Sequence, residues 1–266
     1  MDKPKGIIKT IKLANRTKSF TSKCVICNNE IKGIYYTFPI GYCCENCYLS
    51  NPRCFHCGLP ANKYSPYIFQ DDDFILCQKC NKNKIVQKDD LKKLHYKMKF
   101  YAKEALGIYI YIKKVMLISS EELKYKTKGI SYGTGRTTGY CQSSWQYSSI
   151  NDVKVTNDIY LQNGMPYNML FGTLAHEYGH AWEYQNKRSD LLIYRQDNII
   201  FCEGFAQWVS YHTLRQYNLK EQANKIITNY KDDPIYGDGL KKMLNLEKKL
   251  GSKQAVLEYV KNNCDF

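Results

Sequence analysis

The sequence predicts an α+β protein in which a small cysteine-rich module precedes a larger domain built of helices and a small sheet. Nine of the twelve cysteines fall between residues 24 and 80. After them, segments with apolar residues at helical spacing alternate with short β-branched and aromatic runs. A chain of 266 residues is long enough for one large domain beside a small one. We therefore expect a basic tail over residues 1–20, a zinc-binding module over 21–84 and the larger domain over 85–266.

The charge of the chain limits its partners and its location. The formal net charge is +14, but the lysines are spread along the whole sequence apart from a cluster in the tail, which we expect to be solvated. Nucleic acid is therefore a partner that the sequence allows but does not favour. No run of about 18 apolar residues suits a membrane span, and no apolar signal-peptide core of about 7–15 residues precedes the module. A soluble, cytoplasmic protein is expected.

Eight of the cysteines form four Cys-x2-Cys pairs, a spacing that aims two sulfurs at one ion. In sequential pairing, Cys24, Cys27, Cys44 and Cys47 bind one structural zinc, and Cys54, Cys57, Cys77 and Cys80 bind another. Two such sites end to end have the layout of a LIM-type double zinc module. Interleaved pairing, as in cross-brace modules, is one alternative. Disulfides are another, and the missing signal peptide argues against them. The sequence leaves open whether Cys43 or Cys44 is the ligand.

Several elements of the larger domain can be placed from pattern alone. We expect a helix over residues 90–106, with His95 exposed on it, and one or two strands in "GIYIYIKKVMLIS". The glycine-rich "KGISYGTGRTTGYC" predicts a hairpin or loop, because it lacks the Gly-Lys-Ser/Thr ending of a P-loop. A short strand at about residues 155–161 is expected to bind an extended substrate along its edge. A helix over 167–184 follows it.

The last of these helices contains "TLAHEYGHAW", an HExxH motif. Residues four apart lie on one helix face, so His176 and His180 can bind the same ion. Glu177 lies beside them and suits a general base acting on a metal-bound water. The alternative is a helix with two surface histidines, but the apolar neighbours Ala175 and Trp182 indicate burial, and an unpartnered buried histidine is unfavourable.

A third ligand is expected on the next apolar helix, "NIIFCEGFAQWVSYHTL", which carries the lone carboxylate Glu203. A buried carboxylate requires a metal or a cation, so the alternative is an ion pair with lysine or arginine. Gln207, one turn later, is expected to support a ligand. His212 is a rival ligand that lies more than two turns further along. The motif followed by a distant glutamate predicts a gluzincin-like metallopeptidase domain with one catalytic zinc.

The ordered motifs "LAHEYGHAWEYQ", "EGFAQWV" and "DDPIYGDGL", behind the cysteine module, resemble those of the ubiquitin-activated LIM-domain metallopeptidases that limit organ growth in plants, the DA-one family. The resemblance extends over about residues 24–262 and includes the glycine-rich "GTGRTTG". It implies zinc binding by His176, His180 and Glu203, with Glu177 as the base. It also implies cleavage of regulatory proteins and activation by ubiquitin or another protein regulator. The chain departs from longer members in having one LIM-like module and no acidic ubiquitin-interacting helices before Cys24.

The expected function is therefore zinc-dependent cleavage of protein substrates. Tyr236 is the expected donor to the oxyanion, and Asp238 is expected to position the turn or a ligand. The alternative for both is that they only cap the following helix. Two other functional classes stay open. A SprT-like, DNA-associated metalloprotease would bind DNA with strong salt dependence, and a non-catalytic LIM adaptor would have an inactive peptidase fold.

Overall fold

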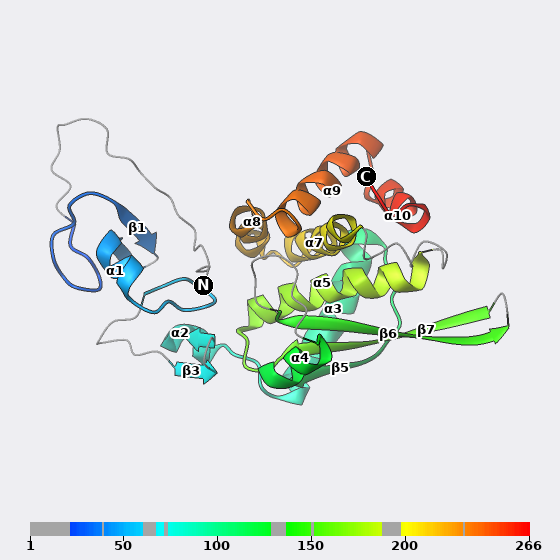
Figure 1. Ribbon diagram of the computed structural model, residues 1–266, viewed down its shortest axis with the longest axis horizontal. Helices are drawn as coiled ribbons and strands as arrows, with labels where there is room; N and C mark the ends of the chain where they lie inside the picture. Colours follow the sequence, from blue (N-terminus) through cyan, green and yellow to red (C-terminus); the bar gives the residue numbers. More distant parts are fainter. Residues whose placement is uncertain are drawn as a thin grey trace. The chain divides into compact units, whose positions relative to one another are not determined.

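The computed structural model divides into two compact units, Met1–Lys84 and Ile85–Phe266 (Figure 1). The structure describes residues 22–38, 40–60, 68–71, 74–128, 137–149, 152–187, 198–230 and 232–266. The basic tail expected over residues 1–20 and most of the glycine-rich segment lie outside these ranges. The α+β prediction is confirmed, because small sheets and helices occur together in the described chain.

The first unit contains two successive copies of one motif, a two-stranded antiparallel hairpin followed by a short helix. In chain order the elements are β1 (Tyr35–Phe38), β2 (Gly41–Cys44), α1 (Glu45–Ser50), β3 (Ile68–Asp71), β4 (Phe74–Leu76) and α2 (Gln78–Lys82). A turn with one Cys-x2-Cys pair precedes each hairpin, and the second pair of each copy lies at the start of the helix. The repeat thus gives each copy its own four cysteines.

The turn before each hairpin has the same backbone hydrogen bonds in both copies. The N–H of Asn28 donates to the Cys24 carbonyl, and the N–H of Gly58 donates to the Cys54 carbonyl, both at 2.8 Å. Asn28 and Gly58 have positive φ angles of 63° and 71°. Glycine and asparagine tolerate this left-handed conformation better than other residues. The local sequence therefore determines both turns.

The second unit contains a three-stranded mixed sheet with the order β5-β7-β6. The strands are β5 (Ile112–Ile118), β6 (Gly139–Ser149) and β7 (Asp152–Gln162), and the short helix α4 (Ser120–Lys126) follows β5. β7 pairs parallel with β5 and antiparallel with β6. The expectation that the strand at about 155–161 binds substrate along its edge is wrong, since β7 is central and both of its edges are already paired from Asn157 onward. In the described chain, β6 and β5 are the edge strands.

Helices cover this sheet in successive layers (Figure 1). They are α3 (Lys88–Leu106), α5 (Tyr167–Asn186), α7 (Ile199–Gln216), α8 (Lys220–Asn229), α9 (Tyr236–Leu250) and α10 (Lys253–Asn262). α5 packs against β6, β7 and α7, and α7 packs in turn against α9. α5 and α7 approach closely at Gly179, where a Cβ would lie 2.6 Å from Ala206 Cα. Only glycine fits that crossing, so it holds the two helices at short range.

α3 packs against α5, α7 and β5, and this packing changes the position expected for His95. The prediction that His95 is exposed is wrong. Its ring lies 5.8 Å from the Tyr178 ring in an edge-to-face contact, and its Nε2 atom is buried. Burial, with a smaller effect of Lys99, lowers the pKa of His95 to about 4. His95 is therefore neutral at pH 7 and belongs to the packing between α3 and α5.

The polar segment at residues 81–90 is mostly structured. Its first residues finish α2 and its last residues begin α3. Between them, Ile85 is buried, its N–H donates to the Met165 carbonyl at 2.9 Å, and its carbonyl accepts from Gly164 at 3.1 Å. The larger unit therefore begins at Ile85. In the described part of the chain, none of the helices has the length and apolar character needed to cross a bilayer.

Candidate metal centres

α5 and α7 bring His176, His180 and Glu203 together, although Glu203 follows the motif by more than twenty residues. His176 Nε2 lies 3.1 Å from His180 Nε2 and 3.1 Å from Glu203 Oε2. His180 Nε2 lies 3.4 Å from the same carboxylate oxygen. The two histidines project from successive turns of α5, and Glu203 faces them from the buried helix α7. Three potential ligand atoms therefore converge on one point.

The spacing of these atoms fits a tetrahedral metal. Zinc bonds of about 2.0–2.1 Å to nitrogen and oxygen place tetrahedral ligands about 3.3 Å apart. The side chains of His176, His180 and Glu203 are 14%, 8% and 5% exposed. Burial by itself raises the pKa of Glu203, but the two histidines outweigh this effect and hold that pKa well below its ordinary value. The carboxylate is thus ionised, as a metal ligand must be.

Glu177 is buried next to this group, at 5% exposure. Its carboxylate lies where β6 begins, because a Cβ built on Gly139 would meet Glu177 Oε1 at 2.7 Å and Thr173 Cγ2 at 2.6 Å. Thr173 also forms a 3.3 Å hydrogen bond with the hydroxyl of Thr138, the residue before β6. Gly139 thus makes room for the Glu177 carboxylate. Nothing in the sequence alone signals this role of Gly139.

Tyr236, the first residue of α9, lies near the three potential ligands. Its ring centroid is 6.0 Å from that of His176 and 5.4 Å from that of Tyr230. Burial is the main cause that raises the pKa of Tyr236 well above its ordinary value, followed by the negative charge of Glu203. The phenol therefore keeps its proton and can donate a hydrogen bond at neutral pH.

The turn before Tyr236 is held by Asp233 rather than by Asp238. The Asp233 carboxylate accepts from the N–H groups of Ile235 at 2.9 Å and Tyr236 at 2.8 Å. The Asp238 carboxylate instead pairs with Lys241 at 2.9 Å, and both side chains are half exposed. The expectation that Asp238 positions the turn is therefore corrected in favour of Asp233. An acidic residue just before a helix is a capping signal that "DDP" already contained.

Two other expected residues lie on α7. Gln207 is buried one turn after Glu203. His212 is directed away from the histidine–glutamate group, because its Nε2 pairs with Glu247 Oε2 at 2.8 Å. The Trp208 indole N–H donates to the same carboxylate oxygen at 2.8 Å. These bonds link α7 to α9, so His212 is a structural residue rather than a ligand.

A close contact between two glycines joins α7 to α9 beside the site. A Cβ on Gly204 would lie 2.6 Å from the Gly239 carbonyl carbon, and a Cβ on Gly239 would lie 2.5 Å from the Ile200 carbonyl oxygen. Gly204 follows Glu203 directly, and Gly239 lies one turn after Tyr236. The contact therefore positions Tyr236 relative to Glu203. The sequence contains both glycines but does not indicate that they meet.

The cysteines of the first unit form two groups that could each hold an ion. The groups are Cys24, Cys27, Cys44 and Cys47, and Cys54, Cys57, Cys77 and Cys80, with all ligand atoms of a group within 4.8 Å of one another. Cys27 Sγ lies 4.0 Å from Cys44 Sγ, and Cys57 Sγ lies 3.8 Å from Cys77 Sγ. Zinc–sulfur bonds of about 2.3 Å place tetrahedral sulfurs about 3.8 Å apart. The structure therefore groups the pairs sequentially, and both groups are compatible with zinc.

The convergence of the sulfurs decides between Cys43 and Cys44 in the first group. Cys24 Sγ accepts from the N–H groups of Ile26 and Cys44, both at 3.4 Å. Cys44 belongs to the group, whereas Cys43 is fully buried and its thiol donates to the Cys44 carbonyl at 3.4 Å. Cys43 is therefore a buried packing residue, and Cys44 is the candidate ligand.

A buried ion pair beside the histidine–glutamate group was not anticipated from the sequence. Glu183 Oε1 accepts from Lys187 Nζ at 2.7 Å and from Cys202 Sγ at 3.1 Å. The side chains of Glu183 and Lys187 are both fully buried. Their i,i+4 spacing at the end of α5 was the available signal. The contacts connect the end of α5 to the start of α7.

Comparison of the chain with protein-family models, with curated proteins and with solved structures gave no match.

Proposed function

We propose that the chain is a zinc-dependent endopeptidase that cleaves protein substrates. The observation that carries the proposal is the convergence of His176, His180 and Glu203 with a buried Glu177 beside them and Tyr236 nearby. Two imidazoles and one carboxylate are the protein ligands of many hydrolytic zinc sites. Zinc held by them would polarise the scissile carbonyl and lower the pKa of a water molecule.

The chain's own residues supply the proton transfers and the orientation. Glu177 is the base that takes a proton from the attacking water and delivers it to the leaving amine. Tyr236 keeps its proton and donates a hydrogen bond to the carbonyl oxygen as negative charge develops there. Asp233, by holding the turn, fixes where α9 begins and hence where this hydroxyl lies.

An extended substrate would pair with the edge of β6. In the described chain β6 pairs with β7 alone, and its first residue, Gly139, lies against Glu177. A substrate strand added to this edge would therefore approach the base directly, with main-chain hydrogen bonds supplying affinity that depends little on sequence. The two thiolate groups have closed ligand sets and would stabilise the first unit rather than react.

Metal content and hydrolysis together test this proposal. Wild type should bind three zinc ions per chain by atomic emission, and His176→Ala and Glu203→Ala should each bind two. Glu177→Gln should retain three ions while hydrolysis of labelled casein falls by about 10²-fold or more. Activity of Glu177→Gln equal to wild type would overturn the proposed base. Three ions with no hydrolysis of casein or of the chain itself would favour the adaptor function instead.

A further inference from the structure

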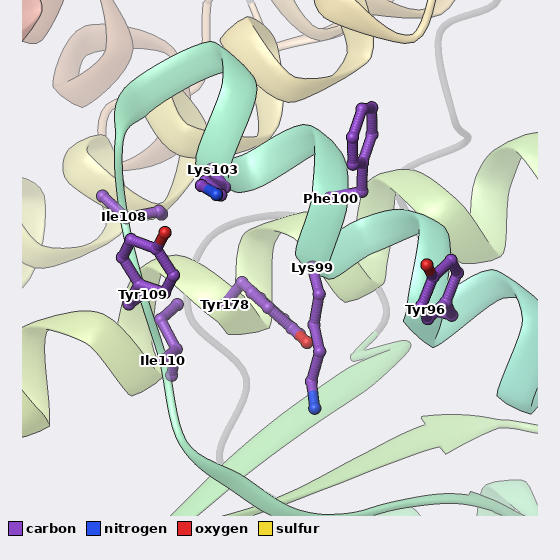
Figure 2. A pocket seen from close by; sticks show the side chains of 8 residues that line it. All are labelled: Tyr96, Lys99, Phe100, Lys103, Ile108, Tyr109, Ile110 and Tyr178. Atoms are coloured by element: carbon purple, nitrogen blue, oxygen red, sulfur yellow. The ribbon is translucent and has the colours of Figure 1, made fainter.

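A shallow cavity of about 360 Å³ lies on the side of α5 formed with α3 and the segment at residues 107–111 (Figure 2). Three exposed aromatic side chains, two lysines and one buried tyrosine line it. They are Tyr96, Phe100, Tyr109, Lys99, Lys103 and Tyr178. α3 supplies four of them, and the residues that follow α3 supply Tyr109. The fold therefore brings Tyr178 of α5 together with residues of α3 and of the segment that follows α3.

The aromatic rings are unusually available to a ligand. Tyr96 is 76% exposed, Phe100 is 52% exposed and Tyr109 is 71% exposed. In Figure 2, Tyr96 and Tyr109 lie at opposite ends of the cavity, with Lys99 and Tyr178 between them. Large aromatic faces left in water at one location indicate a binding surface. Two separated rings offer two stacking positions.

The cationic groups of the cavity have no acidic counterpart in the described chain. No carboxylate lies within ion-pair distance of Lys99 or Lys103 there, whereas Lys92 and Lys93 on the same helix pair with acids. Lys103 Nζ instead lies 5.3 Å from the Tyr109 ring centroid. Lys103 thus interacts with the Tyr109 side chain, and among the described residues no carboxylate within ion-pair distance competes with an anion for either lysine.

Tyr178 adds an unused hydrogen-bonding group at the base of the cavity. The residue is 1% exposed, and its buried hydroxyl has no hydrogen-bond partner in the described chain. Figure 2 shows this hydroxyl directed from α5 toward Lys99. A buried hydroxyl without a partner is unfavourable, so a ligand atom that reaches it gains a hydrogen bond.

We propose that this cavity binds single-stranded nucleic acid. Unpaired bases stack on the exposed rings at each end, Lys99 and Lys103 neutralise the phosphates between them, and the Tyr178 hydroxyl bonds to a base edge or a phosphate. Alternating aromatic and cationic groups are the features by which proteins bind single strands without reading sequence. An acidic peptide would use the lysines but leave the flat aromatic faces without a matching partner. The proposal is independent of the peptidase activity.

Fluorescence anisotropy of labelled dT12 and rU12 with the full-length protein tests it. Tyr96→Ala and Tyr109→Ala should each weaken binding about fivefold or more, because each removes a stacking platform. Replacing both Lys99 and Lys103 by glutamine should make the slope of log affinity against log salt shallower by about 1.4, which corresponds to two phosphate contacts on a single strand. Tyr178→Phe, which keeps the ring, should weaken binding about twofold to tenfold.

Matched controls separate the cavity from general basic charge. Tyr125→Ala removes a tyrosine that is 86% exposed elsewhere, and Lys248→Gln with Lys249→Gln removes two exposed charges from α9. The proposal requires these controls to bind like wild type and a duplex 12-mer to bind more weakly. Tighter binding of dT12 or of rU12 than of the duplex supports it, and the tighter of the two shows whether the cavity prefers deoxyribose or ribose. Three results would overturn it: equal losses of affinity in the cavity and control variants, absence of oligonucleotide binding, or preference for a labelled oligo-glutamate peptide.

Discussion

Replacing Gly239 by alanine tests whether the contact between α7 and α9 sets the position of Tyr236. The new Cβ would lie 2.5 Å from the Ile200 carbonyl oxygen and 2.7 Å from Gly204 Cα. Ordinary contacts between carbon atoms lie at about 3.5–4.0 Å, so α9 has to move outward by about 1 Å. The contacted atoms are backbone, and no change of rotamer relieves the overlap. Tyr236 lies one turn earlier on α9 and moves with it.

The shift affects activity and stability differently. A misplacement of about 1 Å at a reacting group reduces rates by about 10²-fold, so kcat on labelled casein should fall by about that factor. Overpacking costs about 1–3 kcal/mol in the free energy of unfolding, offset by about 1 kcal/mol from replacing glycine in a helix. Zinc content should stay at three ions, since His176, His180 and Glu203 lie on α5 and α7.

Gly172→Ala provides the matched control, because its Cβ would meet Leu214 Cδ1 at an ordinary 3.7 Å. This variant should keep full activity and gain up to about 1 kcal/mol in urea unfolding. Wild-type kcat in Gly239→Ala would refute the argument that the glycine contact positions Tyr236. An unchanged free energy of unfolding, together with unchanged kcat, would show that α9 accommodates the methyl group without moving.

Three further predictions concern other parts of the chain. Gly139→Ala should crowd Glu177 and lower kcat on casein by about tenfold or more with zinc content unchanged; a wild-type rate would contradict the crowding. Cys44→Ser should lose one zinc ion by atomic emission whereas Cys43→Ser should keep all three, and the reverse result would exchange their roles. The pKa of His95 is lower in the folded state than in the unfolded state, so the unfolded state takes up a proton on His95 at a higher pH. The free energy of unfolding should therefore fall from about pH 6.5 toward pH 4, less steeply in His95→Gln, and equal slopes by urea titration would refute this.

Local spacing explains which parts of the site could be predicted from sequence. Residues four apart on a helix share a face whatever surrounds the helix, so His176 and His180 could be paired in advance. Two cysteines separated by two residues meet at one turn for the same reason. The role of Glu203 could be predicted because a lone carboxylate in an apolar helix needs a partner. Each of these inferences depends on a few consecutive residues.

Features that depend on contacts between distant segments could not be predicted in this way. The strand at 155–161 was expected to be an edge, but strand order depends on which neighbours pair, and β7 is central. His95 was expected to be exposed, but α5 covers it through Tyr178. Asp238 was expected to hold the turn before α9, but Asp233 does so. Only the folded turn shows which carboxylate reaches the amides of α9.

The sequence by itself determined the two kinds of candidate metal ligand, the α+β class and the separation of the cysteine-rich module from the larger domain, because these follow from local periodicity and spacing. Only the tertiary structure decided which other groups join these ligands. It brought Tyr236 and Gly139 to the histidine–glutamate group and assembled the aromatic and lysine cavity from α3, α5 and residues 107–111. The placement of these side chains depends on close glycine contacts and on the order of the strands. Both are determined by packing across the whole domain.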